Sequence, residues 1–326
     1  MKIHLKDERP LLYLSGTGSH SMGEEDIISQ GAKYRCYSYA YVCPGGFYYQ
    51  KKMEESLNTS IKNNLGIMMD SSAHSFHKLL EKGLRKTSGK YKIRDIEKLR
   101  DQTIDEYAKY VRKEEKNWDF SVTFDYIKDC PTIYKMQKQL ESYKINPIPV
   151  YHGDQPIDWL RRYCEEGYKL VGIGSIKRNN KNMRRYFDSC FNVATKYGTL
   201  LHGLAVTSLT GMYSFPWYSV DSATWAKVAA FGCVLCTSDS VNDTFGYLHM
   251  TDRRHGQSRG IEYIELSPDQ KKSIERVVNK DGFDVHELQV DGAVRSLYNI
   301  FVFCNKVSQL KKDLADSKQR WKPLLV

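Results

Sequence analysis

Short apolar runs alternate with longer helix-compatible stretches along most of this chain, and this alternation constrains the fold more than any other feature. Eight runs have a strand-like composition, at residues 33–42, 65–69, 120–124, 146–151, 168–173, 200–206, 216–220 and 229–236. The stretches between them carry helical periodicity, as at 93–116, 156–167 and 183–198. Strands that alternate with helices form parallel βαβ units, so we predict an α/β fold. Eight such strands favour a closed (β/α)8 TIM barrel over an open sheet.

The sequence shows no internal repeat, low-complexity tract or Pro/Gly/Ser-rich linker that would divide it into two domains. We therefore expect residues 1–32 to be an N-terminal segment that precedes the barrel and residues 33–245 to form the barrel. Residues 246–326 are expected to form a basic C-terminal extension packed on it, with a helix that begins near 267–278.

The composition is that of an ordinary globular protein with a positive charge. Of 326 residues, 41% are hydrophobic and 27% charged, and 49 Lys+Arg against 39 Asp+Glu give a formal net charge of +10. This balance favours polyanionic partners such as nucleic acid. The longest apolar run, Val228–Cys236, is too short to span a membrane, and the N-terminus carries charges where a signal peptide is apolar. We expect a cytoplasmic protein without a membrane partner, whose eight scattered cysteines are free thiols.

Polar residues and glycines stand at the ends of several predicted strands. They are Asp70, Asp125, His152-Gly153, Gly172 with Gly174, Thr207-Ser208 and Asp221. Barrel enzymes place their chemistry at these carboxyl ends. Any one of the three aspartates could instead cap a helix, which is the commonest role of Asp before a helix. Three at equivalent ends of one barrel favour a shared site over three independent caps.

Two aspartate motifs resemble those of a known family. MMDSSAHSF at 68–76 resembles the Asp-Ser-Gly-Gly/Ala-aromatic signature of the tRNA-guanine transglycosylases, and YSVDSATW at 218–225 resembles the nucleophile segment of their archaeal members. PVYHG at 149–153 and LVGIGS at 170–175 stand where that family has its Val-Gln-Gly and Gly-Gly-Leu segments. The resemblance covers roughly residues 33–236.

Within this superfamily, FPWYSVDSATW with HGLAVTS before it is most similar to the DpdA-like branch. Those enzymes exchange guanine in DNA for a 7-deazaguanine and occur in phages and in bacterial modification clusters. The resemblance therefore implies DNA, or tRNA, and a free preQ0-like 7-deazaguanine base as partners. It also implies a role in protecting DNA from restriction, in the host cytoplasm if the protein is phage-encoded. A homodimer, the arrangement common in the tRNA branch, stays open.

The resemblance implies a base exchange by two displacements at C1′ of the sugar. Asp221 matches the nucleophile that forms a covalent glycosyl intermediate, and Asp70 matches the carboxylate that manages the proton on the departing and arriving purine. Asp125 matches the residue that accepts hydrogen bonds from N1–H and the 2-amino group of guanine. This chemistry requires no cofactor.

The remaining substrate contacts follow from the same resemblance. His152 takes the place of a Gln that contacts the base carbonyl, and Gly172 allows a backbone amide to approach the ring closely. Ser71 is expected near the base or the ribose, and His74 stands where relatives stack Phe or Tyr on the purine. Further contacts are predicted at Gly153, Gly174 and His202.

Clusters of basic residues follow two of the predicted strands, where they would share the rim of the site and suit phosphate binding. The residues are Lys177, Arg178, Lys181, Arg184 and Arg185 after the fifth strand, and Arg253, Arg254 and Arg259 after the eighth. A solvated charged face is the alternative for either cluster. A third cluster, within 311–322, is interleaved with acids and is typical of a surface helix.

The tRNA enzymes carry a zinc motif, Cys-x-Cys-x2-Cys followed by a distant His, that has no match here. Cys233 and Cys236, followed by His249 and His255, approach the spacing of a Cys2His2 site. Both cysteines fall in the predicted eighth strand, so we interpret them as core residues and predict no required metal.

Two other functions remain open at this stage. One is a tRNA-guanine transglycosylase of the queuosine or archaeosine type, against which the missing zinc motif argues. The other is a catalytically inactive barrel that only binds nucleic acid. Retention of both Asp70 and Asp221 argues against that function, because a binding module needs neither carboxylate facing a phosphate backbone. A carbohydrate glycosidase could use the same pair but would not call for so basic a chain.

Overall fold

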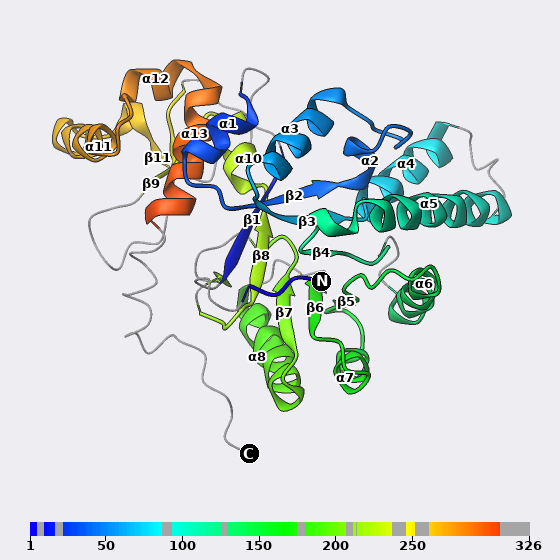
Figure 1. Ribbon diagram of the computed structural model, residues 1–326. Coiled ribbons are helices and arrows are strands. Elements are labelled where there is room, and N and C mark those ends of the chain that lie inside the picture. Colours follow the sequence, from blue (N-terminus) through cyan, green and yellow to red (C-terminus); the bar gives the residue numbers. More distant parts are fainter. Residues whose placement is uncertain are drawn as a thin grey trace.

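Eight parallel strands form a curled sheet with helices on its outside (Figure 1). The computed structural model describes residues 1–4, 10–16, 22–86, 93–125, 129–174, 180–206, 211–212, 214–236, 246–251 and 261–306. The strands of the sheet are β1 Leu11–Ser15, β2 Tyr34–Ser38, β3 Gly66–Asp70, β4 Phe120–Ser121, β5 Val150–His152, β6 Leu170–Gly174, β7 Leu200–Gly203 and β8 Ser219–Ser222. Their spatial order is β4-β3-β2-β1-β8-β7-β6-β5.

The two outermost strands of this order approach each other. Val122, just after β4, forms a parallel bridge with Ile148, just before β5. Ile148 N–H donates to the carbonyl oxygen of Ser121 at 2.8 Å, and Thr123 N–H donates to the carbonyl oxygen of Ile148 at 3.0 Å. The sheet therefore curls round until its edges touch, and the fold is TIM-barrel-like, with a smaller C-terminal sheet and helices added to it.

Helices connect successive strands, as the predicted βαβ pattern requires. Those that follow the strands of the large sheet are α1 Glu24–Ser29, α2 Tyr39–Val42, α3 Lys51–Lys62, α4 Ala73–Lys86, α5 Ile93–Lys113, α6 Cys130–Ser142, α7 Asp158–Glu165, α8 Asn180–Tyr197 and α10 Thr224–Ala230. A 3₁₀ turn, η1 at Glu115–Asn117, follows α5. Among the described helices, none combines the length and the apolar character that crossing a bilayer requires.

Alternate residues of the strands point into the curl of the sheet and pack against one another. This inner cluster consists of Leu11, Tyr13, Cys36, Met68, Phe120, Val122, Ile148, Val150, Leu170 and Tyr218. The opposite face of β2 and β3 packs on the helices that follow them, through residues such as Tyr37, Met69 and Phe76. The interior is thus filled by side chains at one end, and the space for a ligand lies beyond the carboxyl ends of the strands.

A second, three-stranded sheet follows α10. It consists of β9 Cys233–Cys236, β10 Gly246–His249 and β11 Ile261–Glu262 in the order β11-β10-β9. The elements after it are η2 Tyr263–Glu265, α11 Pro268–Lys280, α12 Val285–Val290, α13 Gly292–Phe301 and the π-turn η3 Val302–Lys306. As predicted, a helix begins at 268, and Ser267 caps it by accepting from Gln270 N–H.

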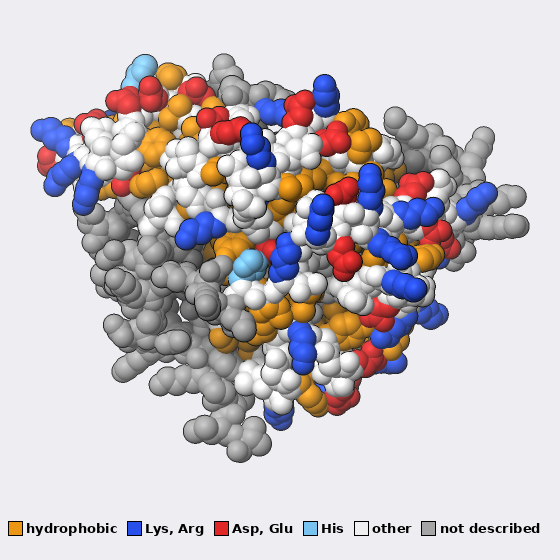
Figure 2. Space-filling view, viewed as in Figure 1, with side chains coloured by type: hydrophobic (Ala, Val, Ile, Leu, Met, Phe, Trp, Pro, Cys, Tyr) orange, Lys and Arg blue, Asp and Glu red, His pale blue; other side chains and the backbone are white. Residues whose placement is uncertain are grey.

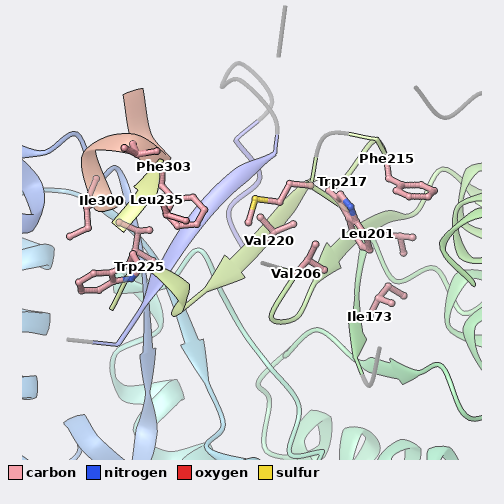
Figure 3. Close-up of a cluster of buried hydrophobic side chains, with 14 of the residues drawn as sticks. Ile173, Leu201, Val206, Phe215, Trp217, Val220, Trp225, Leu235, Ile300 and Phe303 are labelled. Carbon is pink, nitrogen blue, oxygen red and sulfur yellow. The ribbon is translucent and has the colours of Figure 1, made fainter. Parts of the chain in front are cut away.

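The C-terminal helices pack on the large sheet and its helices through a shared apolar core (Figure 3). Trp225 of α10 lies there with Leu235 of β9 and Ile300 of α13. The buried Asn299 side chain donates to the carbonyl oxygen of Trp225 and accepts from Leu235 N–H at 2.7 Å. These two bonds fix α13 to both α10 and β9.

The predicted eighth strand is wrong. The large sheet takes its eighth strand from Leu11–Ser15, between β2 and β8, and not from residues 229–236. The expectation that residues 1–32 only precede the barrel is therefore wrong for Leu11–Ser15. The run at 229–236 is instead divided, because α10 continues to Ala230 and Gly232 turns the chain at φ +79°. Only Cys233–Cys236 is a strand, and it pairs antiparallel with β10 in the smaller sheet.

The described cysteines are free thiols, as the scattered spacing predicts. They are Cys36, Cys43, Cys130, Cys164, Cys190, Cys233 and Cys304.

Candidate active site

A cavity of about 900 Å3 opens at the carboxyl ends of the parallel strands. It takes residues from all eight strands of the large sheet or the loops that follow them, and from the helices α2, α3, α4 and α10. Its lining is Ser15, Gly16, Cys36, Ser38, Tyr41, Gln50, Met53, Met68, Asp70, His74, His77, Val122, Asp125, His152, Gly174, Leu204, Ala205, Asp221 and Lys227. This size is within the range of pockets for small organic ligands.

Asp221, in β8, presents a carboxylate held by donors on both oxygens. Ser15 Oγ, on the neighbouring strand β1, donates to Oδ2 at 3.0 Å. Ala205 N–H, in the loop after β7, donates to Oδ1 at 2.8 Å. Ala205 has φ +54°, a left-handed conformation that non-glycine residues seldom adopt. The loop therefore accepts backbone strain while its amide faces this carboxylate.

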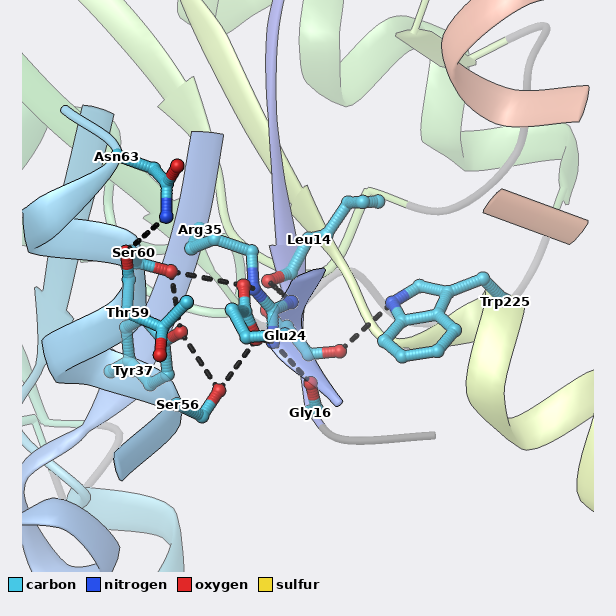
Figure 4. Close-up of polar contacts among 11 residues, drawn as sticks. Leu14, Gly16, Glu24, Arg35, Tyr37, Ser56, Thr59, Ser60, Asn63 and Trp225 are labelled. Carbon is cyan, nitrogen blue, oxygen red and sulfur yellow. Dashed lines mark hydrogen bonds and ion pairs between the residues drawn. The ribbon is translucent and has the colours of Figure 1, made fainter. Parts of the chain in front are cut away.

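Ser15 is itself fixed by contacts of Arg35 and Trp225 with the backbone of β1 and Gly16; Figure 4 shows Arg35 beside Leu14 and Gly16. The buried Arg35 guanidinium donates to the carbonyl oxygens of Leu14 at 2.6 Å and Gly16 at 3.0 Å, on either side of Ser15. Trp225 Nε1 donates to the carbonyl oxygen of Ser15 at 3.0 Å. Arg35 also pairs with the buried Glu24 at 2.6 Å, so its charge is compensated where water is excluded.

Asp70, at the end of β3, also receives one serine hydroxyl and one backbone amide. Ser38 Oγ on β2 donates to Asp70 Oδ2 at 2.8 Å, and Ser72 N–H donates to the same oxygen at 2.9 Å. Ser72 has φ +65°, again in the left-handed region. Burial raises the pKa of Asp70 to about 6, and the charges of Asp125 and Asp221 raise it as well, against the lowering effect of the Ser38 and Ser72 bonds.

Asp125 and His152 form a pair on the cavity wall. His152 Nε2 lies 3.1 Å from Asp125 Oδ2. His152 ends β5, and Asp125 follows β4, so the bridge that joins the two edges of the sheet also brings these side chains together. The pair offers one edge of a ligand the Asp125 carboxylate, which accepts hydrogen bonds, and the His152 imidazole, whose nitrogens can donate or accept.

Cys36 of β2 lies on the cavity floor. Burial raises the pKa of its thiol, and the negative charges of Asp221 and Asp70 raise it further. The thiol therefore stays protonated and is not suited to act as a nucleophile.

Six of the residues predicted from the sequence meet at this cavity, and four do not line it. The six are Asp70, His74, Asp125, His152, Gly174 and Asp221. Ser71 is fully buried behind the cavity, and its Oγ has no hydrogen-bond partner among the described residues. Gly172 lies within β6, opposite Val150 and His202 in register. Any side chain at Gly153 would meet the Tyr186 ring at 2.5 Å. His202 lies beneath the cavity floor, fully buried.

Most of the predicted nucleic-acid contacts fall outside the described residues, namely Lys177, Arg178, Arg253, Arg254 and Arg259, together with the side chain of Lys181. Arg184 and Arg185 are exposed on α8, whose first turns follow β6 at the carboxyl ends of the strands. The exposed Lys227 lines the cavity. On the face seen in Figure 2, Lys and Arg side chains are interspersed with Asp and Glu rather than gathered in one patch.

Of the four residues considered for zinc, two lie together. Cys233 Sγ is 3.0 Å from Nδ1 of His249, its partner on β10. The register places Cys236 opposite Gly246, at the other end of the strand pair. The side chain of Cys236 and all of His255 lie outside the described residues. Across the described parts of the chain, no three His, Cys, Asp or Glu side chains form a group that could hold a metal ion.

Several cavity residues were missed by the sequence analysis. Ser15 ends β1, where the same strand-end argument would have found it had that strand been recognised. Cys36 and Ser38 lie in β2, which ends at Ser38 and not at residue 42 as predicted. Tyr41, Gln50 and Lys227 come from helices or loops, and no spacing in the sequence indicates that they reach the cavity.

No family model matches this chain, and no curated protein matches it in sequence. The chemical groups of the cavity are therefore the guide to function. It contains two carboxylates in different environments, a carboxylate–imidazole pair and the cationic side chain of Lys227. Such a set can bind a polar heterocycle and support nucleophilic and proton-transfer steps at an adjoining carbon.

Proposed function

We propose that this protein is a DNA-guanine transglycosylase that replaces guanine by a 7-deazaguanine through a covalent aspartyl–sugar intermediate. The observation that carries the proposal is the pairing of Asp70 and Asp221 at one cavity, at the ends of two parallel strands. Their surroundings differ. Burial favours the protonated form of Asp70, whereas both carboxylate oxygens of Asp221 accept hydrogen bonds.

In the first displacement, Asp221 attacks C1′ of the sugar. A bond forms between its carboxylate oxygen and C1′, the bond from C1′ to the purine breaks, and the electron pair leaves with the purine. Asp70 supplies the proton that the departing base takes up. Because its pKa is raised to about 6, a fraction of Asp70 is protonated near neutral pH, as a general acid must be.

In the second displacement, Asp70 removes the proton from the incoming base, and the base nitrogen attacks C1′. The bond to Asp221 then breaks, and the carboxylate regains its electron pair. Two inversions at C1′ leave the new base on the original face of the sugar, as in retaining glycosidases.

Asp125 and His152 support selection of the base. The Asp125 carboxylate can accept from N1–H and the exocyclic amine of a guanine-like edge. His152 Nε2 lies 3.1 Å from Asp125 Oδ2, and with both ring nitrogens protonated the imidazole can donate through Nδ1 to the carbonyl oxygen next to N1. Adenine presents neither the N1 proton nor that carbonyl, so this pair disfavours it.

The charge of the chain supports a polymeric substrate over a free nucleoside. The formal net charge is +10, and Lys227, Arg184 and Arg185 are exposed near the carboxyl ends of the strands. A guanine stacked in a duplex is out of reach of a cavity of this kind, so the proposal requires a flipped or single-stranded base, at a cost of a few kcal/mol.

The test is an exchange assay with 7-cyano-7-deazaguanine, with DNA and unmodified tRNA offered in parallel and the digested nucleosides read by mass spectrometry. The proposal predicts the deazaguanine nucleoside in DNA and not in tRNA. Incorporation into tRNA alone would replace the proposal by a tRNA-guanine transglycosylase. Binding of nucleic acid without exchange in either polymer would contradict the catalytic role of the aspartates.

A further inference from the structure

His202 of β7 is a polar ring in an apolar part of the sheet interior. It is fully buried, and its ring packs edge-on against Phe120 at 5.4 Å and Tyr13 at 6.3 Å between ring centroids. Burying an imidazole among such groups is unfavourable unless its nitrogens meet polar partners. Both nitrogens of His202 face polar groups of β8.

The two ring nitrogens of His202 make different contacts. Nδ1 lies 2.8 Å from Ser219 Oγ, its register partner on β8. Nε2 lies 3.5 Å from Asp221 Oδ1 and has no hydrogen bond of normal length among the described residues. Ser219 and Asp221 are two positions apart on one strand, so both face the same side of the sheet as His202.

The proton position follows from electrostatics. A bare Nε2 lone pair would face the Asp221 carboxylate and repel it, whereas Nε2–H attracts it. Nδ1 then has a lone pair, which accepts from the Ser219 hydroxyl. The contacts define a line that runs from Ser219 through His202 to the carboxylate of Asp221 on the cavity floor.

We propose that His202 is a positioning residue for Asp221, which holds the side chain by directing Nε2–H at Oδ1 from beneath the cavity. This inference rests on the proposed function of Asp221 as nucleophile. Oδ1 then faces two fixed donors, His202 and Ala205 N–H, while Oδ2 faces the rotatable hydroxyl of Ser15. Oδ2 is therefore the oxygen that attacks C1′.

The contact gains importance when the intermediate breaks down. As the bond between Asp221 and C1′ breaks, negative charge returns to the carboxylate, and Nε2–H stabilises it. A contact of 3.5 Å is longer than a normal hydrogen bond, and such contacts in free enzymes tighten when the reacting complex forms. The residue thus acts through Asp221 and does not touch the base, unlike the substrate contact expected from the sequence.

The first experiment needs no activity. In protein labelled with 15N-histidine, the ring signals of His202, identified by their loss in His202→Gln, should show the Nε2–H form at neutral pH. Asp221→Asn should shift the Nε2 signal, and the matched control Asp70→Asn should leave it in place. A proton on Nδ1 with bare Nε2, or equal shifts in both variants, would overturn the proposal.

The second experiment compares His202→Gln with His202→Leu. The glutamine amide can still donate toward Asp221, whereas leucine fills similar volume without a donor. We expect His202→Leu to lower kcat for base exchange about tenfold with KM nearly unchanged, and His202→Gln to recover most of the loss. His249→Leu, which removes another buried histidine in the smaller sheet, should leave kcat unchanged. Equal losses in His202→Gln and His202→Leu would show a merely structural role.

The two experiments separate this inference from the proposed function. If the wild-type protein exchanges no base, the proposed function fails, and the histidine spectra still test the contact with Asp221. If exchange occurs but the spectra show no coupling to Asp221, only the role of His202 fails.

Discussion

Asp70 and Asp221 occupy equivalent places in the sheet, yet their surroundings differ. Each stands at or near the end of a parallel strand, receives a serine hydroxyl from a neighbouring strand, and receives the amide of a left-handed residue. At Asp70 both donors meet Oδ2, and the amide comes from the loop directly after the same strand. At Asp221 the donors are divided between the oxygens, and the amide comes from the loop of the adjacent strand.

Under the proposed function, this difference assigns the two aspartates different chemical roles. Burial dominates at Asp70, so its pKa is raised to about 6 and the group can exchange protons near neutral pH. At Asp221, donors on both oxygens and the His202 ring beneath suit a carboxylate that carries charge and returns to it after each turnover. Pairs of acids whose environments differ in this sense divide acid and nucleophile between them.

The largest effect is expected at Asp221, the proposed nucleophile. Asp221→Asn should abolish base exchange, by at least about 10⁴-fold, because an amide oxygen does not attack C1′. Its affinity for DNA, measured by fluorescence anisotropy, should stay within about twofold, since phosphate contacts dominate affinity. Exchange at the wild-type rate in this variant would contradict the proposed role of Asp221 as the nucleophile.

Asp70→Asn should slow the release of guanine by about 10²- to 10⁴-fold, the usual contribution of a general acid. In the wild-type protein, release of guanine in a single turnover should fall as pH rises above about 6, because the proton on Asp70 is then lost. In Asp70→Asn the rate should be low and independent of pH in that range. The same inflection in the variant and the wild type would assign the proton to another group.

Ser38 and Ser15 each donate a hydroxyl to one of the two aspartates, so their alanine variants can be compared directly. Ser38→Ala removes a bond that lowers the pKa of Asp70, so the inflection of guanine release should move upward by about half to one pH unit. Ser15→Ala should lower the rate about tenfold without moving the inflection, because its hydroxyl serves Asp221. An inflection that moves equally in both variants would mean that the two carboxylates titrate as one unit.

The raised pKa of Asp70 also predicts a stability effect. Its value of about 6 in the folded state exceeds the ordinary 3.8, so the folded state binds more protons between about pH 4 and 6, and stability falls as pH rises through that window. Asp70→Asn removes this loss and should raise the free energy of unfolding at pH 7 by about 1 to 2 kcal/mol in urea denaturation. The exposed control Asp154→Asn should change it by less than about 0.5 kcal/mol. A less stable Asp70→Asn variant at pH 7 would contradict the pKa direction.

The smallest effect is expected at the strained amide beside Asp221. Ala205→Gly keeps the N–H that donates to Asp221 and relieves the left-handed φ of +54°. Exchange should stay within about twofold, and the free energy of unfolding should rise by up to about 1 kcal/mol. The control Ala108→Gly, within helix α5, should instead lower stability by about 1 kcal/mol or more. Thermal unfolding of both variants distinguishes strain relief from a general effect of glycine.

The sequence predicted the alternation and the strand-end aspartates because both depend on local patterns. The run LGIMM, for example, is followed directly by Asp70. Once the strands are taken as parallel, Asp70 must lie at the carboxyl edge of the sheet. The strand Leu11–Ser15 escapes prediction because the run LLYLS is only five residues long and directly follows a charged stretch. The apolar run at 229–236 reads as one strand in the sequence because periodicity does not distinguish the end of a buried helix from a buried strand.

The surroundings of the aspartates could not be predicted, because they depend on contacts between distant parts of the chain. Ser15 meets Asp221 only because β1 inserts beside β8, and Ala205 reaches it through a left-handed turn. The raised pKa of Asp70 depends on burial by neighbours and on two other acids at the same cavity. The burial of His202 beneath Asp221 likewise follows from the register of β7 with β8.

The proposed covalent intermediate on Asp221 can be trapped. The protein is mixed with guanine-containing single-stranded DNA without an incoming base, quenched with acid, and analysed as intact protein and as peptides by mass spectrometry. We expect a covalent sugar adduct on the peptide that contains Asp221, which is lost in Asp221→Asn and discharged by adding 7-cyano-7-deazaguanine. An adduct on Asp70, or base exchange that proceeds with no adduct on Asp221, would contradict this expectation.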